Sequence, residues 1–266
     1  MLMDFDKLGA WKWVLSGLCT LLMLFLLLPI VFIVALSFGS SRWLVFPPPA
    51  WTLKWYYELF ADPRWLGAAL TSAKIGLIVM ILAVILGLLA SLALVRGRFR
   101  GRAVLRAFFL TPMVLPVVIV AVALYAAFLQ LGLNGTLLGF VIAHLIVALP
   151  FSIITISGAL ETFDPAIEDA AILCGATPWE ARLRVTLPSI SHGLYSAAIF
   201  SFLISWDEVV LAIFMASPSL QTLPVKVWTT LRQDLTPVIA AASTLLVALT
   251  VLLMLAAALI RKGKSQ

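Results

Sequence analysis

The sequence predicts an all-α membrane protein with about six transmembrane helices, forming a single domain over residues 1–266. Of its residues, 63% are hydrophobic and 11% are charged, whereas soluble domains carry roughly 25% charged residues. A soluble fold of this size would expose much of that apolar surface to water, so the lipid bilayer is the expected solvent. Cys19 and Cys174 lie far apart in the sequence and predict neither a disulfide nor a metal site.

Six apolar runs are long enough to cross the bilayer core, which is ~30 Å thick and takes about 20 helical residues. They cover residues 14–38, 75–95, 107–129, 137–160, 190–216 and 237–260. We expect helices because backbone polar groups in lipid must be satisfied within their own segment. The fourth run contains His144, for which a hydrogen-bonded helix contact is favoured over a proton relay.

The distribution of Lys and Arg predicts the orientation of these helices. With a cytoplasmic N-terminus, the segments on that side carry twelve Lys and Arg, and the opposite segments carry five, leaving aside Lys74 at the edge of a span. Cytoplasmic loops are enriched in these residues, so both termini and the loop of residues 161–189 are expected in the cytoplasm. The basic residues cluster at the ends of apolar runs, which indicates contact with membrane lipid rather than nucleic acid.

Residues 164–188 predict two short helices separated by a turn. Asp164 fits an N-cap, and Gly175 fits a left-handed helix end. Thr177 and Glu180 have the spacing of a capping box at the start of the second helix. Two cytoplasmic helices of this kind can form a rigid lever, although the spacing alone also suits an ordinary structured loop.

The same segment resembles the EAA loop of binding-protein-dependent ABC importer permeases. The matching residues are Asp169-Ala170-Ala171, then Gly175 after three residues, then Val185, Thr186 and Leu187-Pro188 after nine more. Asp169 replaces the glutamate of that pattern and Val185 replaces its isoleucine. The resemblance implies a fold like that of type I ABC importer permeases, in which this loop docks on the ATP-binding subunit. The coupling residues that it implies are Glu168, Asp169, Ala170, Ala171, Gly175, Val185, Leu187 and Pro188.

The expected partners follow from this resemblance. The sequence has no GxxxxGK[ST] segment, so ATP and Mg²⁺ are expected on a separate subunit. The chain itself is expected to be a transport subunit, not an enzyme, with no catalytic residue, cofactor or metal. The resemblance implies two copies of an ATP-binding subunit, a second permease that is identical or homologous, and a periplasmic or extracellular substrate-binding protein. It also implies a multi-pass protein of the bacterial inner (cytoplasmic) membrane.

Asp207 and Glu208 are unusual because they fall in the middle of the fifth apolar run. A charged side chain at the bilayer centre costs a contested ~2.5–3.5 kcal/mol or more. Ser205 and Glu208 have capping-box spacing, which predicts a break in the helix here. One interpretation is that one or both acids attract a cationic substrate, with Trp206 adding a cation–π contact. The alternative is that they pair with a neighbouring helix, a helix end or the second permease.

The sequence is most similar to permeases of the spermidine/putrescine type. The segments that carry this resemblance are Leu53–Tyr56, Arg98–Gly101, Thr111–Pro116, Ser205–Glu208, Thr222–Pro224 and Ala240–Leu246. With the cation–π interpretation of Trp206, the expected substrate-pathway residues are Trp55, Ser205, Trp206, Asp207 and Glu208.

One departure from that subfamily leaves the substrate open. Some polyamine permeases carry an acid where this chain has Val117. The same class of transporter could therefore carry another small solute, such as a phosphonate, an opine or an amino-acid derivative. A membrane scaffold or membrane-embedded enzyme is disfavoured, because His144, Asp207 and Glu208 are too sparse for a catalytic cluster and a scaffold needs no acids in mid-membrane.

Overall fold

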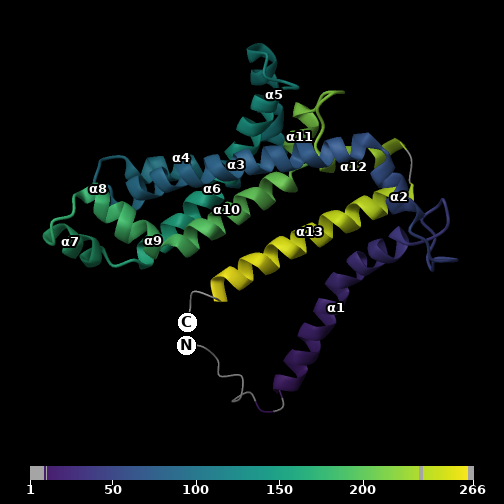
Figure 1. The fold of residues 1–266 in the computed structure, drawn as a ribbon, viewed down its shortest axis with the longest axis horizontal. Coiled ribbons are helices and arrows are strands. Elements are labelled where there is room, and N and C mark those ends of the chain that lie inside the picture. The colour runs from purple at the N-terminus through teal and green to yellow at the C-terminus, as the bar shows by residue number, and fades with distance from the viewer. Residues whose placement is uncertain (1–8, 10, 234–235, 263–266) are drawn as a thin grey trace. The chain divides into compact units, whose positions relative to one another are not determined.

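The computed structural model describes residues 9, 11–233 and 236–262, with side chains described up to residue 255 (Figure 1). Within these residues the chain is helical, and its only β-structure consists of isolated bridges between Gly39 and Trp51 and between Ser217 and Leu220. The all-α prediction is confirmed. The helices are α1 (Trp11–Ser37), α2 (Lys54–Ala61), α3 (Pro63–Arg96), α4 (Arg102–Val114), α5 (Val117–Leu131), α6 (Leu137–Thr162), α7 (Pro165–Leu173), α8 (Pro178–Ala181), the π-helix η2 (Arg182–Thr186), α9 (Leu187–Ser189), α10 (Ser191–Trp206), α11 (Val210–Met215), α12 (Leu223–Gln233) and α13 (Pro237–Lys262).

The chain divides into two units. The first contains residues 1–62 and 230–248, and the second contains residues 63–229 and 249–266. Among the described residues, α1, α3, α6 and α13 are long and apolar enough to cross a membrane. Two bent helix pairs raise the number of candidate spans to six, in agreement with the predicted number.

One of these bent pairs differs from the uninterrupted span predicted at residues 107–129. The axes of α4 and α5 meet at 102°, and Leu115 between them has an extended backbone, with φ −74° and ψ 141°. Pro116 explains the bend, because proline has no N–H for the helix ladder and disfavours helical geometry in the residue before it.

In the second unit, α3, α6 and α10 pack together through small residues (Figure 1). Ser152 Oγ on α6 donates to the carbonyl of Ala83 on α3, at 2.8 Å. In the other direction, Ser91 Oγ on α3 donates to the carbonyl of Ile153, at 3.1 Å. Small and hydroxyl side chains let helix backbones approach closely and form hydrogen bonds between helices in a membrane.

Gly87 marks a close approach of α3 to α6. A Cβ placed on Gly87 would meet Ser152 Oγ at 2.3 Å and Ser152 Cβ at 2.9 Å. We expect Gly87→Val to separate the two helices and lower the thermal stability of the detergent-purified protein by several degrees, because overpacking costs about 1–3 kcal/mol. Gly158→Ala is the matched control, since a Cβ there meets nothing within 4 Å and alanine favours the helix. Equal melting temperatures for the two variants would contradict this packing.

The first unit contains a folded loop between α1 and α2. Trp55 is 4% exposed, and its indole Nε1 donates to the carbonyl of Gly39. Tyr56 contacts the end of α1, with its hydroxyl 2.7 Å from Ser37 Oγ. Trp55 therefore packs α2 against this loop and is a core residue of the first unit. Trp51 is exposed, and an exposed tryptophan suits a membrane interface.

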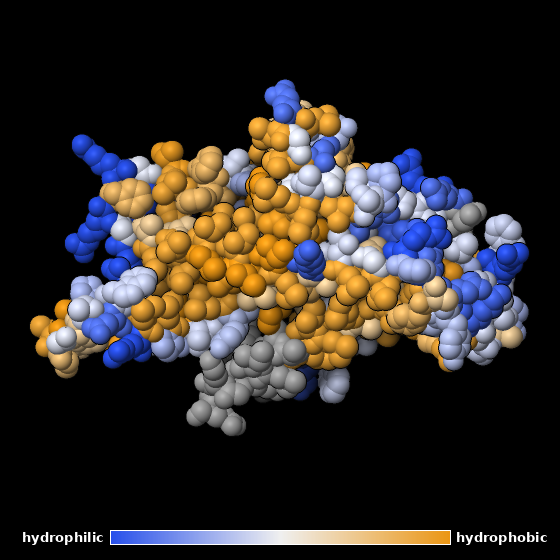
Figure 2. Space-filling view, turned by 45° about the horizontal axis from the view of Figure 1, so that its top comes forward, coloured by the Kyte–Doolittle hydropathy of each residue, from blue (hydrophilic) through white to orange (hydrophobic). Residues whose placement is uncertain are grey.

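Large apolar side chains are exposed on several helices, including Leu22 and Phe25 on α1 and Leu77 and Ile81 on α3. Figure 2 shows hydrophobic side chains over much of the face in view. Water does not accommodate apolar patches of this extent on a monomer. Lipid or a second membrane protein must cover them.

Candidate functional site

The predicted helix–turn–helix of the EAA-like segment is present. Asp164 Oδ1 caps α7 by accepting a backbone N–H of its first turn, at 2.9 Å. Gly175 ends α7 in the left-handed region, with φ +99°. Its N–H bonds to the carbonyl of Ile172, and the N–H of Ala176 bonds to that of Ala171, at 2.9 and 3.1 Å. This pair of bonds is a Schellman motif, which requires a residue that tolerates positive φ.

The second helix begins with the predicted capping box. Glu180 Oε2 accepts the N–H of Thr177 at 3.0 Å, and Thr177 Oγ1 accepts the N–H of Glu180 at 3.3 Å. The backbone bond from Thr177 lowers the pKa of Glu180 from its ordinary value of 4.5. A lowered folded-state pKa means that the cap is fully present above pH 4.5 and is lost as the pH falls through the folded-state value.

Glu168 joins the two helices of this segment. Its Oε1 lies 3.3 Å from Nε of Arg182, and its Oε2 accepts a hydrogen bond from Thr186 Oγ1 at 2.8 Å. The ion pair alone contributes little because Arg182 is largely exposed, but the two contacts together fix α7 against η2. The family resemblance implied that Glu168 is one of the coupling residues. The structure shows in addition that its carboxylate links α7 to η2.

Arg96, at the end of α3, binds backbone carbonyls at the C-terminal end of α6, just before the EAA-like segment begins. Its Nη2 donates to the carbonyl of Phe163 at 3.0 Å and to that of Leu160 at 3.4 Å. Its guanidinium also lies 5.9 Å from the centre of the Phe163 ring. These bonds satisfy carbonyls at the end of α6, which have no partner within the helix.

Among the residues implied by the motif, Asp169, Ala170, Gly175 and Pro188 are exposed, whereas Ala171, Val185 and Leu187 are partly buried. Beside them lie exposed large apolar side chains that are absent from the motif. Leu173 is 89% exposed and Trp179 is 62% exposed. Pattern matching did not include these two residues, although large apolar residues in a predicted cytoplasmic loop were a signal. We call Ala170, Leu173, Gly175 and Trp179 the loop surface.

The fifth predicted span is broken, as the sequence predicted. Helix α10 ends at Trp206 and α11 begins at Val210, with Asp207 and Glu208 in the interruption. The cap differs from the expected one, because Glu208 itself caps α11 by accepting the N–H of Leu211 on Oε1, at 2.8 Å. Ser205 instead contacts α6.

His144 on α6 is the partner of Ser205. Its Nδ1 lies 2.9 Å from Ser205 Oγ and 3.1 Å from the carbonyl oxygen of Ser205. The last carbonyls of a helix have no intrahelical donor, and an Nδ1–H supplies one to Ser205 at the break. His144 is fully buried, and the predicted helix contact is confirmed.

We expect His144→Leu to destabilise the break, because the Ser205 carbonyl would lose its donor inside the protein. Leaving a buried polar group unsatisfied costs about 1–3 kcal/mol. Thermal unfolding in detergent should detect this loss, and His144→Asn should recover part of it through its side-chain N–H. His192→Leu is the control, since His192 is exposed at the start of α10. An unchanged melting temperature for His144→Leu would contradict this role.

The residues predicted for the substrate pathway differ in burial and belong to different units. Ser205 and Trp206 are buried, and the Trp206 ring stacks on Phe202 with centres 5.7 Å apart. Trp55 belongs to the other unit. Asp207 is exposed and Glu208 is partly buried. Of the predicted pathway residues in the second unit, Asp207 and Glu208 thus have carboxylates that are not fully buried, whereas Ser205 and Trp206 pack inside the protein.

Comparison with known families agrees with these features. Residues 83–265, which include the EAA-like segment and the break, match the family described as the binding-protein-dependent transport system inner membrane component. The chain belongs to this family. The permease is thus a transport subunit rather than an enzyme.

The permease is similar to two curated polyamine permeases of Escherichia coli strain K12. It is 28% identical over 251 residues to the spermidine/putrescine transport system permease protein PotC, covering 94% of this chain and 95% of the relative. It is 32% identical over 230 residues to the putrescine transport system permease protein PotI, covering 84% and 81%. It is also 28% identical to the trehalose transport system permease protein SugB of Mycobacterium tuberculosis, over 78% of this chain and 77% of that one.

A solved structure has the same fold. A chain from the crystal structure of a bacterial ABC transporter that imports the acidic polysaccharide alginate matches with a TM-score of 0.74 at 16% identity. The match covers 98% of the permease and 99% of the alginate transporter chain. At this identity the likeness shows the ABC importer permease fold and nothing of the substrate.

Proposed function

We propose that the permease imports a small organic cation of the polyamine class, such as putrescine or spermidine. The observation that carries this proposal is the similarity to PotC over 94% of the chain. The exposed Asp207 beside Glu208 supports it, because carboxylates attract an ammonium group strongly where water is scarce. The relative that carries trehalose makes a neutral or zwitterionic small solute the alternative to be tested.

The proposal includes a mechanism of coupling. The loop surface docks on a separate subunit that binds ATP and Mg²⁺. Because the Glu168 contacts fix α7 against η2, the segment moves as one rigid piece when that subunit moves. Exposed Leu173 and Trp179 support this role, because apolar side chains at such a surface suit a protein interface. Arg96 then passes the movement from the loop to α3 and α6.

The complete transporter in this proposal lies in the bacterial inner membrane, with both termini of the permease in the cytoplasm. It contains two ATP-binding subunits, a second permease and a periplasmic or extracellular substrate-binding protein. The chain itself needs no cofactor. Dependence on a binding protein is supported by the family to which the chain belongs, and a second permease would cover part of the exposed apolar surface.

Uptake by the reconstituted complex tests the substrate. The permease would be purified with its ATP-binding subunit and second permease, placed in liposomes and supplied with its binding protein. We expect ATP-dependent accumulation of labelled putrescine or spermidine, with competition by the other polyamine and none by trehalose or a neutral amino acid. Absence of polyamine uptake from a complex with active ATP hydrolysis would overturn the polyamine proposal.

A further inference from the structure

Gly76 on α3 is a buried glycine that faces an aromatic ring of α10. A Cβ placed on Gly76 would lie 3.0 Å from Cε2 and 3.1 Å from Cδ2 of Phe202. Carbon atoms in good contact are about 3.5–4.0 Å apart, so the ring occupies the space that any side chain at position 76 would need. The missing side chain of Gly76 therefore lets the Phe202 ring lie directly on the backbone of α3.

The Phe202 ring in turn supports Trp206, the last residue of α10. The two rings are stacked, with an interplanar angle of 18° and centres 5.7 Å apart, and we call them the aromatic stack. Trp206 is 5% exposed, and its indole Nε1 has no hydrogen-bond partner within the part of the chain that the structure describes. The position of the indole therefore depends on packing, and stacking on Phe202 orients it.

The last turn of α10 carries Asp207. The N–H of Asp207 bonds to the carbonyl of Leu203 at 3.0 Å, so the backbone of Asp207 still follows the hydrogen-bond ladder of α10. His144 holds this turn from α6 through its contacts with Ser205. The aromatic stack holds the same turn from the side of α3. A shift of the stack would consequently move Asp207.

We propose that Gly76 is a positioning residue for Asp207 at the break. By leaving room for the Phe202 ring, it sets the place of Trp206 and so the distance from the Asp207 carboxylate to a cation in the pathway. The inference rests on the proposed function, in which Asp207 attracts the cargo. At an effective dielectric constant near 20, moving a carboxylate from about 4 Å to 5 Å from an ammonium group lowers the binding constant roughly fourfold. Small displacements of the stack are therefore enough to change the affinity for cargo.

Equilibrium binding of a polyamine tests this role. The complex of permeases and ATP-binding subunits is placed in nanodiscs without binding protein, and the binding of labelled putrescine is measured over a range of concentrations. We expect Gly76→Val to raise the Kd roughly fourfold and Gly76→Ala to raise it less, with an unchanged number of binding sites. A structural defect would instead lower the number of sites and leave the Kd of the remaining ones unchanged.

A second substitution tests whether the effect passes through the aromatic stack. Phe202→Ala removes the ring that a side chain at position 76 would meet, and we expect it to raise the Kd by itself because Trp206 loses its stacking partner. Adding Gly76→Val to Phe202→Ala should raise the Kd no further. Residues that act through a shared contact show non-additive effects of this kind. Independent effects that multiply would contradict a route through Phe202.

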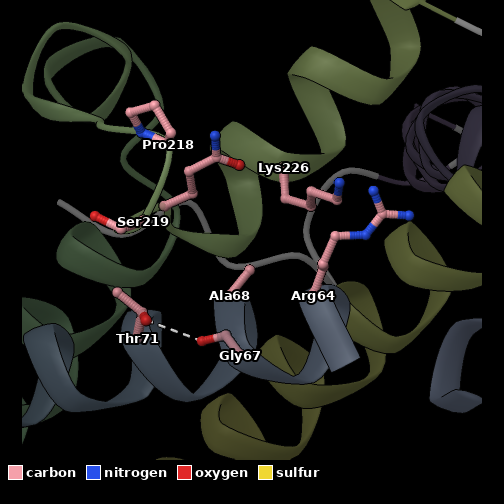
Figure 3. Close-up of a pocket in the computed structure, with 8 residues that line it drawn as sticks. Arg64, Gly67, Ala68, Thr71, Pro218, Ser219 and Lys226 are labelled. Atoms are coloured by element: carbon pink, nitrogen blue, oxygen red, sulfur yellow. Dashed lines mark hydrogen bonds between the residues drawn. The ribbon is translucent and has the colours of Figure 1, made fainter. Parts of the chain in front are cut away.

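Two other glycines are matched controls. Gly67 lies on the same helix and lines a cavity of about 230 Å³ (Figure 3), where a Cβ meets nothing within 4 Å. Gly67→Val therefore makes the same change in α3 without displacing a ring, and the Kd should stay unchanged. Gly193 packs α10 against α6 away from the break, and a Cβ on it would overlap that of Ala159. We expect Gly193→Ala to lower the melting temperature without changing the Kd.

A thiol at position 207 reports the place of the break without cargo. Cys19→Ser and Cys174→Ser remove the native thiols, and Asp207→Cys supplies a single reactive one. The rate at which a charged, water-soluble thiosulfonate labels this thiol is then measured in the nanodisc complex. Because thiol reactivity follows exposure and local charge, we expect Gly76→Val to change the rate at least about twofold. Gly67→Val should leave it unchanged.

The outcomes separate this inference from the proposed function. In a complex that binds putrescine, an unchanged Kd or an unchanged labelling rate in Gly76→Val would overturn the positioning role, as would equal effects in Gly67→Val. Where no putrescine binding is measurable, the labelling rate alone decides the positioning role, and the uptake assay decides the cargo. Only variants that co-purify with the ATP-binding subunit are compared.

Discussion

Gly175→Arg is expected to reduce coupled transport strongly while the complex still assembles. Gly175 has φ +99°, where a residue with a Cβ is strained by roughly 1–2 kcal/mol. The strain opposes the Schellman motif that ends α7 and therefore displaces the loop surface. The added cation also stands beside Leu173 and Trp179, where an apolar interface is proposed. Uptake should fall by roughly 10-fold or more, which corresponds to about 1.4 kcal/mol of lost coupling.

The measurement is ATP hydrolysis by the reconstituted complex with and without its binding protein. We expect Gly175→Arg to lose the stimulation by the binding protein along with uptake. Gly101→Arg is the matched control, because Gly101 also has positive φ, at +87°, and open space around its Cβ position, yet lies outside the loop surface. Normal transport and stimulation in Gly175→Arg would show that this segment does not couple the two subunits.

Asp207→Asn is expected to reduce the uptake of a polyamine by at least about 10-fold, with little effect on folding. The substitution keeps the size of the side chain and removes the exposed charge that would attract the substrate. At an effective dielectric constant near 20, one such charge at 4 Å contributes up to about 4 kcal/mol to a contact with a cation. The complex should retain its melting temperature, because Asp207 is exposed.

Glu208→Gln removes the second negative charge at the same break but keeps the side-chain oxygen that caps α11. A glutamine oxygen can still accept the N–H of Leu211, so the cap on α11 is preserved and the charge is lost. We expect reduced uptake with a normal melting temperature, as for Asp207→Asn. Glu161→Gln removes an exposed acid at the end of α6 and should leave uptake unchanged. Equal uptake by all three variants would remove these acids from the substrate pathway.

Local sequence signals predicted the two helices and the turn of residues 164–188 well. Asp164, Gly175, Thr177 and Glu180 each act on backbone groups within four residues, so their spacing in the chain determines their geometry. The Glu168 contacts could not be predicted in this way, because Arg182 and Thr186 reach the carboxylate only after the chain has turned back on itself.

The break in the fifth span illustrates the same difference. Ser205 and Glu208 have the spacing of a capping box, and this spacing predicted an interruption at the correct place. The competing donor was His144, 61 residues away on α6, and no local rule identifies it. The burial of Trp55 and Trp206 likewise depends on packing within the fold, whereas the resemblance and the aromatic residue type had placed both in the substrate pathway.

The hydrogen bonds between α3 and α6 have a mechanical consequence. Ser152 and Ser91 bind backbone carbonyls of the opposite helix, so sliding one helix along the other would break both bonds together. The helices of this unit are instead interrupted at Leu115–Pro116, at Ile190 and at Asp207–Val209, and interrupted ladders bend more easily than intact ones. We therefore expect bending of this unit to occur at these interruptions, while α3 and α6 move together as a rigid pair.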